Sequence, residues 1–557
     1  MKGNRKKFLS ALVGISLGLT MLAGCGEKKE NSNSGSAFTV ALPTGPEDSP
    51  VYVEAVPGIA DDFIRGMDAS SVLVEENSGV KYYNFDGEEQ DVFQTFAEAG
   101  VNYIRLRVWN DPYDENGRGY GGGNNDVPTA IELGKRASRY GMKVCIDFHY
   151  SDFWADPKRQ HTPKAWENMT LEEKSDALYQ FTYDSLKELI EAGVDVGMVQ
   201  IGNEINYGMC GETSSDNVIT LLKSGSRAVR EISESNQQDI KIVVHYTRIT
   251  EAAKLYGLVE KLEANELDYD VIGLSYYPFW DGSMDNMQKV VSKIKETYGR
   301  EVVVAETSYC YTSADGDGSG NSLVGTTDLV DGYPASVQGQ TSMIRDVVAA
   351  ANEAGASGVF YWEGAWIPVG KANENNSPIW EKYGSGWASS YASDYDPEDA
   401  GLYYGGCSWD NQAFFDFDGH PLDSINVWKY LKYGTTLESA ADYTPIEKAE
   451  TAKENTVDYS DLPNLVKNPG FEEADTSMWN VTYEGDTNPT DFFNKPEDAY
   501  SGDYSFHFFS PDSDMDFSIE QEFTDLEPGT YYLTAYSQGG DCNATVAALG
   551  IGCQVVG

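Results

Sequence analysis

The sequence predicts an α/β protein, a closed (β/α)₈ barrel followed by a β-sandwich module. Two observations predict this organisation. Over about 300 residues, short apolar segments alternate with amphipathic helical stretches, the pattern of right-handed βαβ crossovers in a parallel sheet. From about residue 464 the pattern changes to period-two alternation between turn residues, which is typical of antiparallel strands. An open doubly wound sheet is the alternative for the first part, but no glycine-rich phosphate fingerprint opens its helices.

The predicted elements follow in chain order. Residues 1–24 are expected to be a signal peptide, 25–59 a tether, 60–434 the barrel, 435–463 a linker and 464–557 the β-sandwich. Helical spacing is clearest at residues 170–192 and 340–354. The predicted barrel strands are residues 63–68, 101–109, 142–150, 196–204, 240–247, 270–277, 301–306 and 358–363.

The N-terminus has the order of a secretory signal, with basic residues before an apolar run. That run, from Phe8 to Ala23, is shorter than the roughly 20 residues of a membrane-spanning helix. Its end at Leu22-Ala23-Gly24-Cys25 resembles the bacterial lipobox, which implies cleavage before Cys25 and a lipid on that cysteine. An ordinary signal peptide with a chance cysteine is the other interpretation. We expect the mature chain at the bacterial cell surface, anchored to the membrane by the lipid.

The composition excludes several classes of function. The chain of 557 residues has 89 acidic and 40 basic side chains, a formal net charge of −49. A surface this acidic repels nucleic acid and anionic lipid headgroups. We therefore expect no nucleic-acid partner, and we expect the protein to contact the membrane only through its lipid. Seven cysteines are few for a chain of this length, and their number is odd, so we expect no disulfide framework to hold the fold. We expect a monomer.

Two glutamates end predicted barrel strands, where catalytic residues of such barrels gather. Glu204 ends the fourth strand and Glu306 the seventh, so both side chains can rise from the same rim. Glycosidic bond cleavage needs one protonated carboxyl group and one ionised carboxylate. A structural ion pair with a barrel arginine is the other interpretation.

The neighbouring strand ends supply groups that suit a sugar site. Arg105, Arg107 and Trp109 share one phase of the second strand, and a guanidinium beside Glu306 would hold it ionised. Asn203 is placed to reach a sugar 2-hydroxyl, and Trp362 could form an apolar floor beneath a pyranose ring. Each aromatic residue could instead belong to the core. Further groups in phase at strand ends are Asp147, His149, His245, Tyr276 and Tyr277.

Several segments together resemble glycoside hydrolase family 53, the endo-β-1,4-galactanases. They are residues 63–68, 105–109, 147–157, 202–205 and 306–309, and the resemblance covers about residues 60–432. It implies that Glu204 is the acid/base and Glu306 the nucleophile, acting on the β-1,4-galactan of type I arabinogalactan with retention and without a catalytic cofactor. Retention predicts carboxyl groups about 5–5.5 Å apart. The resemblance also implies substrate contacts from Arg107, His149, Asp152, Asn203, Tyr276 and Trp362.

Two other functions remain open. The same clan of barrels includes retaining hydrolases of other β-1,4-glycans, such as mannan or xylan, and loop residues alone separate these substrates. A non-catalytic glycan-binding surface lipoprotein is the second alternative, although it would not need two glutamates at opposed strand ends.

One loop after the seventh strand has the residues of a calcium site. Asp315, Asp317, Ser319 and Asn321 alternate with glycines, so oxygen ligands could wrap a hard cation. The loop is not an EF-hand, because Thr326 stands where a bidentate glutamate belongs. Bacterial members of the resembled family have a calcium loop here, usually with His at the position of Ser319. A Gly/Asp turn without metal is the alternative, and further ligands could come from residues 439–442.

The second module, from residue 465 through Trp479 to about residue 531, resembles the jelly-roll carbohydrate-binding modules attached to galactanases. We expect it to bind glycan and to raise the local concentration of substrate at the barrel. Its strand pattern stops at Gly557 without a closing strand, so we expect the module to continue.

Overall fold

The computed structural model describes residues 38–324, 329–436, 438, 440, 464–483, 488, 490–495, 502–508 and 517–523. The chain forms two compact units, Met1–Lys448 and Ala449–Gly557. The predicted signal peptide, Cys25 and most of the predicted linker lie outside the described residues. Among the helices described, none is long and apolar enough to cross a membrane.

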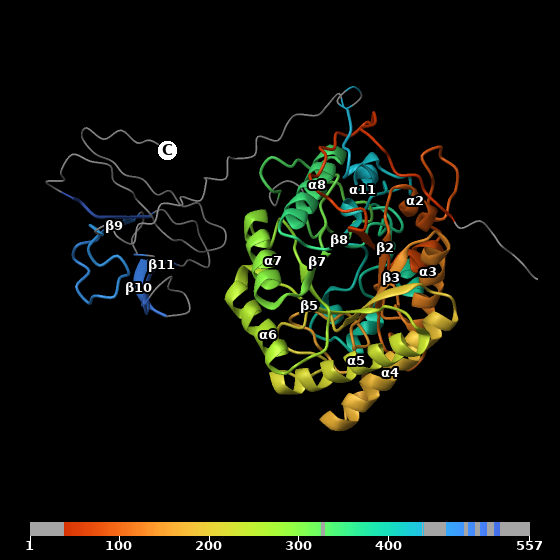
Figure 1. Ribbon diagram of the computed structural model, residues 1–557, viewed down its shortest axis with the longest axis horizontal. Coiled ribbons are helices and arrows are strands. Elements are labelled where there is room, and N and C mark those ends of the chain that lie inside the picture. Colours follow the sequence, from red (N-terminus) through yellow and green to blue (C-terminus); the bar gives the residue numbers. More distant parts are fainter. Residues whose placement is uncertain are drawn as a thin grey trace, which may run out of the picture. The chain divides into compact units, whose positions relative to one another are not determined.

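The first unit is a closed barrel of eight parallel strands in the order of the sequence, with β8 paired to β1. This closure confirms the predicted (β/α)₈ barrel and excludes the open sheet. Figure 1 shows the long helices around the outside of the ring of strands. The strands are β1 (Ile64–Asp68), β2 (Tyr103–Val108), β3 (Lys143–Phe148), β4 (Val196–Ile201), β5 (Lys241–Tyr246), β6 (Val271–Ser275), β7 (Glu301–Glu306) and β8 (Gly358–Tyr361).

Several of the helices begin at polar caps that satisfy one of their first backbone N–H groups. Asp126, Ser283 and Ser336 accept such bonds, and Thr170 forms a capping box with Glu173. The predicted helices at 170–192 and 340–354 correspond to α4 and α8. The helices are α1 (Val72–Asn77), α2 (Val92–Glu98), α3 (Val127–Arg139), α4 (Leu171–Glu191), α5 (Ser215–Asn236), α6 (Ala252–Ala264), α7 (Met284–Tyr298), α8 (Val337–Glu353), α9 (Ser377–Tyr383), α10 (Ala400–Tyr403) and α11 (Val427–Tyr430).

Alternate residues of each strand fill the inside of the barrel. A Cβ atom on Gly66 would lie 2.2 Å from Phe360, so this glycine makes room for the ring inside the barrel. The other phase of each strand packs against the helices in the main core. The apolar inner cluster consists of Ile64, Tyr103, Cys145, Met198, Val243, Val271, Val303 and Phe360. Two residues further along several of these strands the inner residues are polar, and they lead to the carboxyl ends where the site lies.

The segment before β1 packs on the barrel, which corrects the boundary of the predicted tether. Val51, Val53 and Val56 are buried, and the Thr435 N–H donates to the Val53 carbonyl oxygen at 2.8 Å. Glu47 and Thr435 form a parallel bridge. Alternating apolar residues therefore extend the catalytic unit N-terminally into residues that we had assigned to the tether.

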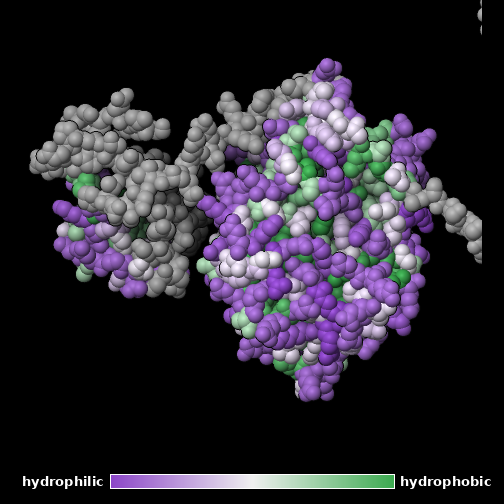
Figure 2. Space-filling view, in the orientation of Figure 1, coloured by the Kyte–Doolittle hydropathy of each residue, from purple (hydrophilic) through white to green (hydrophobic). Residues whose placement is uncertain are grey.

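The described part of the second unit contains antiparallel pairs, as expected for a β-sandwich. β10 (Thr490–Asn494) pairs with β11 (Tyr504–Phe508), and β9 (Asn480–Tyr483) pairs with β12 (Phe517–Glu520). The rings of Phe471, Phe492 and Phe506 pack together between these strands. Figure 2 shows that hydrophilic residues cover most of the visible face of the barrel unit, as its acidic composition predicts.

Candidate active site

Glu204 lies just beyond β4, where the backbone leaves the ladder. Gly202 and Glu204 both have positive φ, 99° and 48° respectively, and this turn follows directly on the last residue of the strand. The Ser275 hydroxyl donates to Oε1 of Glu204 at 2.7 Å. Burial, together with the negative charge of Glu306, raises the pKa of Glu204 to about 8. A carboxyl group in this environment keeps its proton at neutral pH and suits a general acid.

Glu306 is the last residue of β7 and is held by two donors. Its Oε1 lies 2.9 Å from Nη1 of Arg105, and its Oε2 accepts the hydroxyl of Tyr277 at 2.8 Å. The pKa of Glu306 is raised by burial, although the Arg105 charge and the Tyr277 hydrogen bond act to lower it. The expected guanidinium beside Glu306 is therefore Arg105, and its charge favours the ionised form of Glu306 against the effect of burial.

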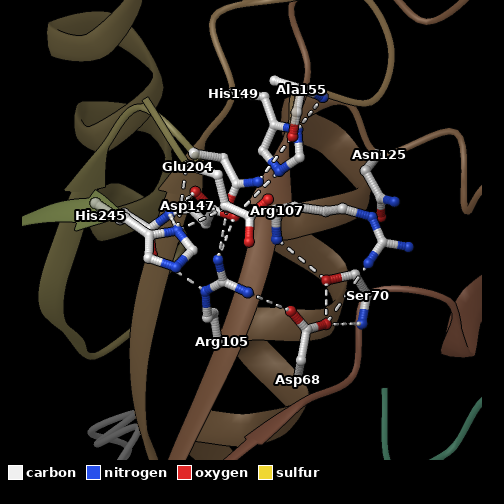
Figure 3. A network of polar contacts seen from close by, with 12 residues as sticks. Asp68, Ser70, Arg105, Arg107, Asn125, Asp147, His149, Ala155, Glu204 and His245 are labelled. Carbon is white, nitrogen blue, oxygen red and sulfur yellow. Dashed lines mark hydrogen bonds and ion pairs between the residues drawn. The ribbon is translucent and has the colours of Figure 1, made fainter. Parts of the chain in front are cut away.

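Arg105 is the centre of a buried polar network on the inside of the barrel (Figure 3). Its guanidinium pairs with Asp68 at 3.2 Å and with Asp147 at 2.9 Å, besides Glu306. It also donates to Oδ1 of Asn203 at 2.9 Å. Because several carboxylates surround it, the pKa of Arg105 is raised although burial alone would lower it. The network thus fixes one cation beside Glu306 and orients Asn203.

His149 lies in the same network with both ring nitrogens occupied. Its Nδ1 accepts the N–H groups of Trp109 at 3.1 Å and of Ala155 at 3.0 Å, so its proton is on Nε2, 3.1 Å from Asp147. The amide of Asn203 donates to the Ala155 carbonyl oxygen at 2.8 Å. These contacts favour a positioning role for His149, and its predicted contact with substrate stays a prediction.

Arg107 and Asp152 are also almost fully buried. Arg107 pairs with Glu363, and its guanidinium carbon lies 4.2 Å from the centroid of the Trp154 ring. Asp152 accepts the backbone N–H groups of Asp111 at 2.9 Å and of Lys164 at 2.7 Å, so it ties two loops together. The structure gives both residues protein partners, and their predicted substrate contacts remain predictions.

Of the two tyrosines after β6, Tyr277 reaches Glu306. Val271 lies in the inner cluster, and the same phase of the strand continues through Ser275 to Tyr277. Tyr276 belongs to the main core, and its hydroxyl donates to the Gly282 carbonyl oxygen at 3.0 Å. Sequence reasoning named Tyr276 as the substrate contact and did not mention Ser275. The period-two alternation of β6 is the signal that identifies Ser275 and Tyr277.

Tryptophan rings gather near Tyr277, the hydrogen-bond partner of Glu306. The Trp362 ring lies 4.6 Å from Trp409 and 6.1 Å from Trp154, centroid to centroid. Trp280, which is 54% exposed, contacts both Trp409 and Tyr277. The role of Trp362 as a floor beneath a sugar ring stays a prediction, and Trp154, Trp280 and Trp409 are neighbours that the prediction missed because they lie in loops.

The predicted calcium loop brings its aspartates together with a distant one. Oxygen atoms of Asp315, Asp317 and Asp410 lie within 4.8 Å of one another. Asp410 is fully buried, and its Oδ1 has no hydrogen-bond partner among the described residues. The buried Oδ1 of Asn321 also has no hydrogen-bond partner among the described residues. Ser319 lies against the segment that follows α10, where its Oγ accepts the Gly406 N–H at 3.0 Å.

Asp315, Asp317 and Asp410 together form what we call the acidic loop cluster, and their oxygen atoms suit a hard cation. Burial and the neighbouring negative charges raise the pKa of Asp410 to about 8 and that of Asp317 to about 6. The unpartnered oxygens are the ligand type that calcium prefers. Residues 439–442, which we considered as further ligands, lie mostly outside the described residues, whereas Asp410 is described and joins the cluster.

Comparison with known proteins gives consistent matches. The model of a family described as glycosyl hydrolase family 53 matches residues 64–428, a range that includes all eight barrel strands. The endo-beta-1,4-galactanase of Bacillus subtilis (strain 168) is 53% identical over 388 residues, which are 69% of this chain and 89% of that protein. The arabinogalactan endo-beta-1,4-galactanase of Cellvibrio japonicus (strain Ueda107) is 34% identical over 347 residues, 60% of this chain and 87% of that protein.

A solved structure agrees with these matches. The Ignisphaera aggregans GH53 catalytic domain is 40% identical to this chain with a TM-score of 0.61. The superposition covers 69% of this chain and 100% of that domain.

Proposed function

Because the chain belongs to glycosyl hydrolase family 53, we propose that it hydrolyses internal bonds of β-1,4-galactan, the pectin side chain of type I arabinogalactan, with retention of configuration. The observation that carries this function is the pair Glu204 and Glu306 at the ends of β4 and β7. Burial raises the pKa of both carboxyl groups, but only Glu306 is paired with a guanidinium, that of Arg105, which favours its ionised form relative to Glu204.

The first step forms a covalent glycosyl-enzyme. The Glu306 carboxylate attacks the anomeric carbon while Glu204 gives its proton to the glycosidic oxygen, which leaves with the cut chain. Arg105 and Tyr277 hold Glu306 in place and keep it ionised before the attack. In the second step Glu204, now ionised, takes a proton from water, and the water oxygen attacks the same carbon from the side that the leaving group vacated. The bond from that carbon to Glu306 breaks, which releases the sugar and regenerates the Glu306 carboxylate. Two inversions give net retention, with a predicted carboxyl separation of about 5–5.5 Å.

The tryptophan cluster supports recognition of a polymer chain. The apolar face of a galactosyl ring packs well on an indole, and Trp362 lies between Trp154 and Trp409. The substrate would also be contacted around these tryptophans by the predicted residues Asn203, Arg107, His149, Asp152 and Tyr276. Of these, Asn203 and His149 belong to the buried network around Arg105 and Asp147.

Substrate choice is tested by measuring reducing ends released from β-1,4-galactan, mannan and xylan. The wild-type protein should act on galactan, and Glu306→Gln should abolish the activity. Glu301→Gln is the matched control, because Glu301 begins the same strand at the opposite end of the barrel and pairs with Lys241. Faster cleavage of mannan or xylan, or full activity of Glu306→Gln, would contradict the proposal.

We also propose a structural calcium ion in the acidic loop cluster. Asp315, Asp317, Asp410 and Asn321 would hold it through carboxylate and amide oxygens, and Ser319 remains a predicted ligand. The buried, unpartnered oxygens of Asp410 and Asn321 support this assignment. The ion would neutralise clustered carboxylates and tie the loop after β7 to the segment around Asp410, and it takes no part in the chemical steps.

The location of the protein is a further proposal. A lipid on Cys25 would anchor the chain to the bacterial membrane, and the polar residues that follow would hold the barrel away from the surface. The protein would work as a monomer, and its C-terminal module would bind the same galactan. Because the two units are on one chain, module binding would raise the effective concentration of substrate at the barrel.

A further inference from the structure

Ser275 is a buried side chain in direct contact with the acid/base, and the mechanism above gives it no role. It is the last residue of β6 and is fully buried. Its Oγ lies 2.7 Å from Oε1 of Glu204 and 2.9 Å from Nε2 of His245. The register of β6 against β7 shifts at this residue, so that Ser275 pairs with Glu306. Ser275 is therefore placed by both strands beside the catalytic pair.

The state of His245 sets the direction of these hydrogen bonds. Its Nδ1 faces two N–H donors, the backbone N–H of Glu204 at 3.3 Å and the side-chain amide of Gln200 at 3.0 Å. Burial, with the nearby Arg105 charge, lowers the pKa of His245 well below its usual value, so the ring is neutral and carries one proton. That proton lies on Nε2 and is donated to Ser275 (Figure 3 shows the position of His245).

One further contact at Nδ1 is with an acceptor and by itself would favour a proton on Nδ1. Oδ1 of Asn203 lies 3.0 Å from Nδ1, but it already accepts hydrogens from Arg105 at 2.9 Å and from Gln200 at 3.2 Å, and the Asn203 amide group is oriented by its bond to Ala155. The backbone N–H of Glu204 can only donate, so its contact with Nδ1 of His245 requires Nδ1 to be an acceptor. Since Nε2 donates to Oγ of Ser275, the single hydroxyl hydrogen of Ser275 is free to be donated to Glu204.

We infer that Ser275, oriented by His245, is a positioning residue that keeps Oε1 of Glu204 as an acceptor and directs the catalytic proton to Oε2. The inference rests on the proposed function. A carbonyl-type oxygen is the better acceptor in a protonated carboxyl group, so a donor at Oε1 leaves the proton on the other oxygen. The same donor stabilises the ionised form of Glu204, which the second chemical step requires.

The charged groups around Glu204 raise its pKa, and the neutral donor Ser275 opposes them. Glu306 on β7, Asp156 in the loop after β3 and Asp281 in the loop after β6 all act to raise the pKa of Glu204. Ser275 acts in the opposite direction through its hydrogen bond. The balance allows Glu204 to hold a proton for the first step and to release it before the second.

The test compares pH profiles of kcat/KM on a galacto-oligosaccharide for the wild type, Ser275→Ala and Ser275→Cys. Removing the donor favours the protonated form, so the alkaline limb should move up by about one pH unit in Ser275→Ala. Ser275→Cys nearly preserves the volume with a weaker donor and should move the limb in the same direction. The matched control is Ser424→Ala, which removes a buried serine hydroxyl that donates to Gln340 away from the site and should leave the limb unchanged.

A second substrate separates positioning from a general structural defect. A dinitrophenyl β-galactobioside has a leaving group that needs no proton, so Ser275→Ala should reduce kcat/KM on it much less than on the oligosaccharide. Unshifted limbs in both Ser275 variants, or equal losses on the two substrates, would overturn the inference. If the wild type cleaves neither substrate, the proposed function itself fails, so the two failures are distinguishable.

Discussion

The Tyr277 hydroxyl donates a hydrogen bond to Oε2 of Glu306 at 2.8 Å, while Arg105 holds the other carboxylate oxygen. Both partners lie on the inside of the barrel, and together they occupy both oxygens of the nucleophile. The attacking oxygen must break or weaken one of these contacts as the glycosyl-enzyme forms. The pair therefore holds Glu306 ionised and aimed before the reaction.

Tyr277→Phe should weaken the nucleophile in a pH-dependent way. The hydroxyl stabilises ionised Glu306, so its loss raises the pKa of that group and shifts the acidic limb of kcat/KM to higher pH. A hydrogen bond to a charged group is worth about 1.5–3 kcal/mol, so kcat/KM should fall roughly 10- to 100-fold. Tyr269→Phe is the control, since that hydroxyl donates to Glu263 on α6, outside the barrel. An acidic limb that stays in place in Tyr277→Phe would contradict the assignment.

The pKa of Glu204 should fall when the charge of Glu306 is removed. Glu306 raises the pKa of Glu204 by like-charge repulsion, so a neutral glutamine at 306 should lower it. Carbon-13 NMR titration of labelled carboxyl groups in Glu306→Gln measures this directly, with Glu301→Gln as the unshifted control. The same change accompanies formation of the glycosyl-enzyme, which neutralises Glu306. A pKa of Glu204 that is equal in the two variants would mean that the carboxyl groups are not coupled.

Calcium removal should lower the melting temperature of the barrel unit. A cation present at 100 times its Kd stabilises by about 2.7 kcal/mol, which corresponds to roughly 3–4 °C for a domain of this size. Asp410→Asn should melt lower than the wild type and should no longer respond to a chelator. Asp418→Asn, at an exposed position in the next loop, should behave as the wild type. The calcium assignment fails if the wild type contains no bound calcium and melts at the same temperature in chelator.

The lipid anchor predicts how the expressed protein partitions. Wild-type protein made in a bacterial host should enter the detergent phase, and Cys25→Ala should stay in the aqueous phase. Ser34→Ala, in the polar stretch after the cysteine, is the control that should partition as the wild type. Detergent-phase Cys25→Ala protein would rule out the anchor.

The barrel could be predicted because its strands are buried on both faces and therefore appear as short apolar runs. The predicted seventh strand, residues 301–306, coincides with β7. Predicted ends were less accurate where polar residues continue the strand pattern, as at 202–204, because the positive φ of Gly202 and Glu204 is not visible in the pattern. Val51, Val53 and Val56 carried an apolar signal that we assigned to the tether and that belongs to the core.

The site was predictable where one strand carries the information and not where distant segments meet. Arg105, Glu204 and Glu306 follow from strand ends and phase. Asp410 joins the acidic loop cluster through a hydrogen bond from Gly316, 94 residues earlier, a proximity that local spacing does not contain. Tyr276 was chosen over Tyr277 although the alternation of β6 distinguishes them. The hydrogen bonds that occupy His149 depend on Trp109 and Ala155, which meet only in the folded barrel.

The anomeric configuration of the first product tests the central claim most directly. Proton NMR of galactan or a galacto-oligosaccharide, recorded within the first minutes of hydrolysis by the wild type, distinguishes the two anomers before mutarotation. Double displacement by Glu306 and Glu204 predicts that the β-anomer forms first and the α-anomer appears later. Initial formation of the α-anomer would show inversion, and it would contradict the assignment of Glu306 as nucleophile.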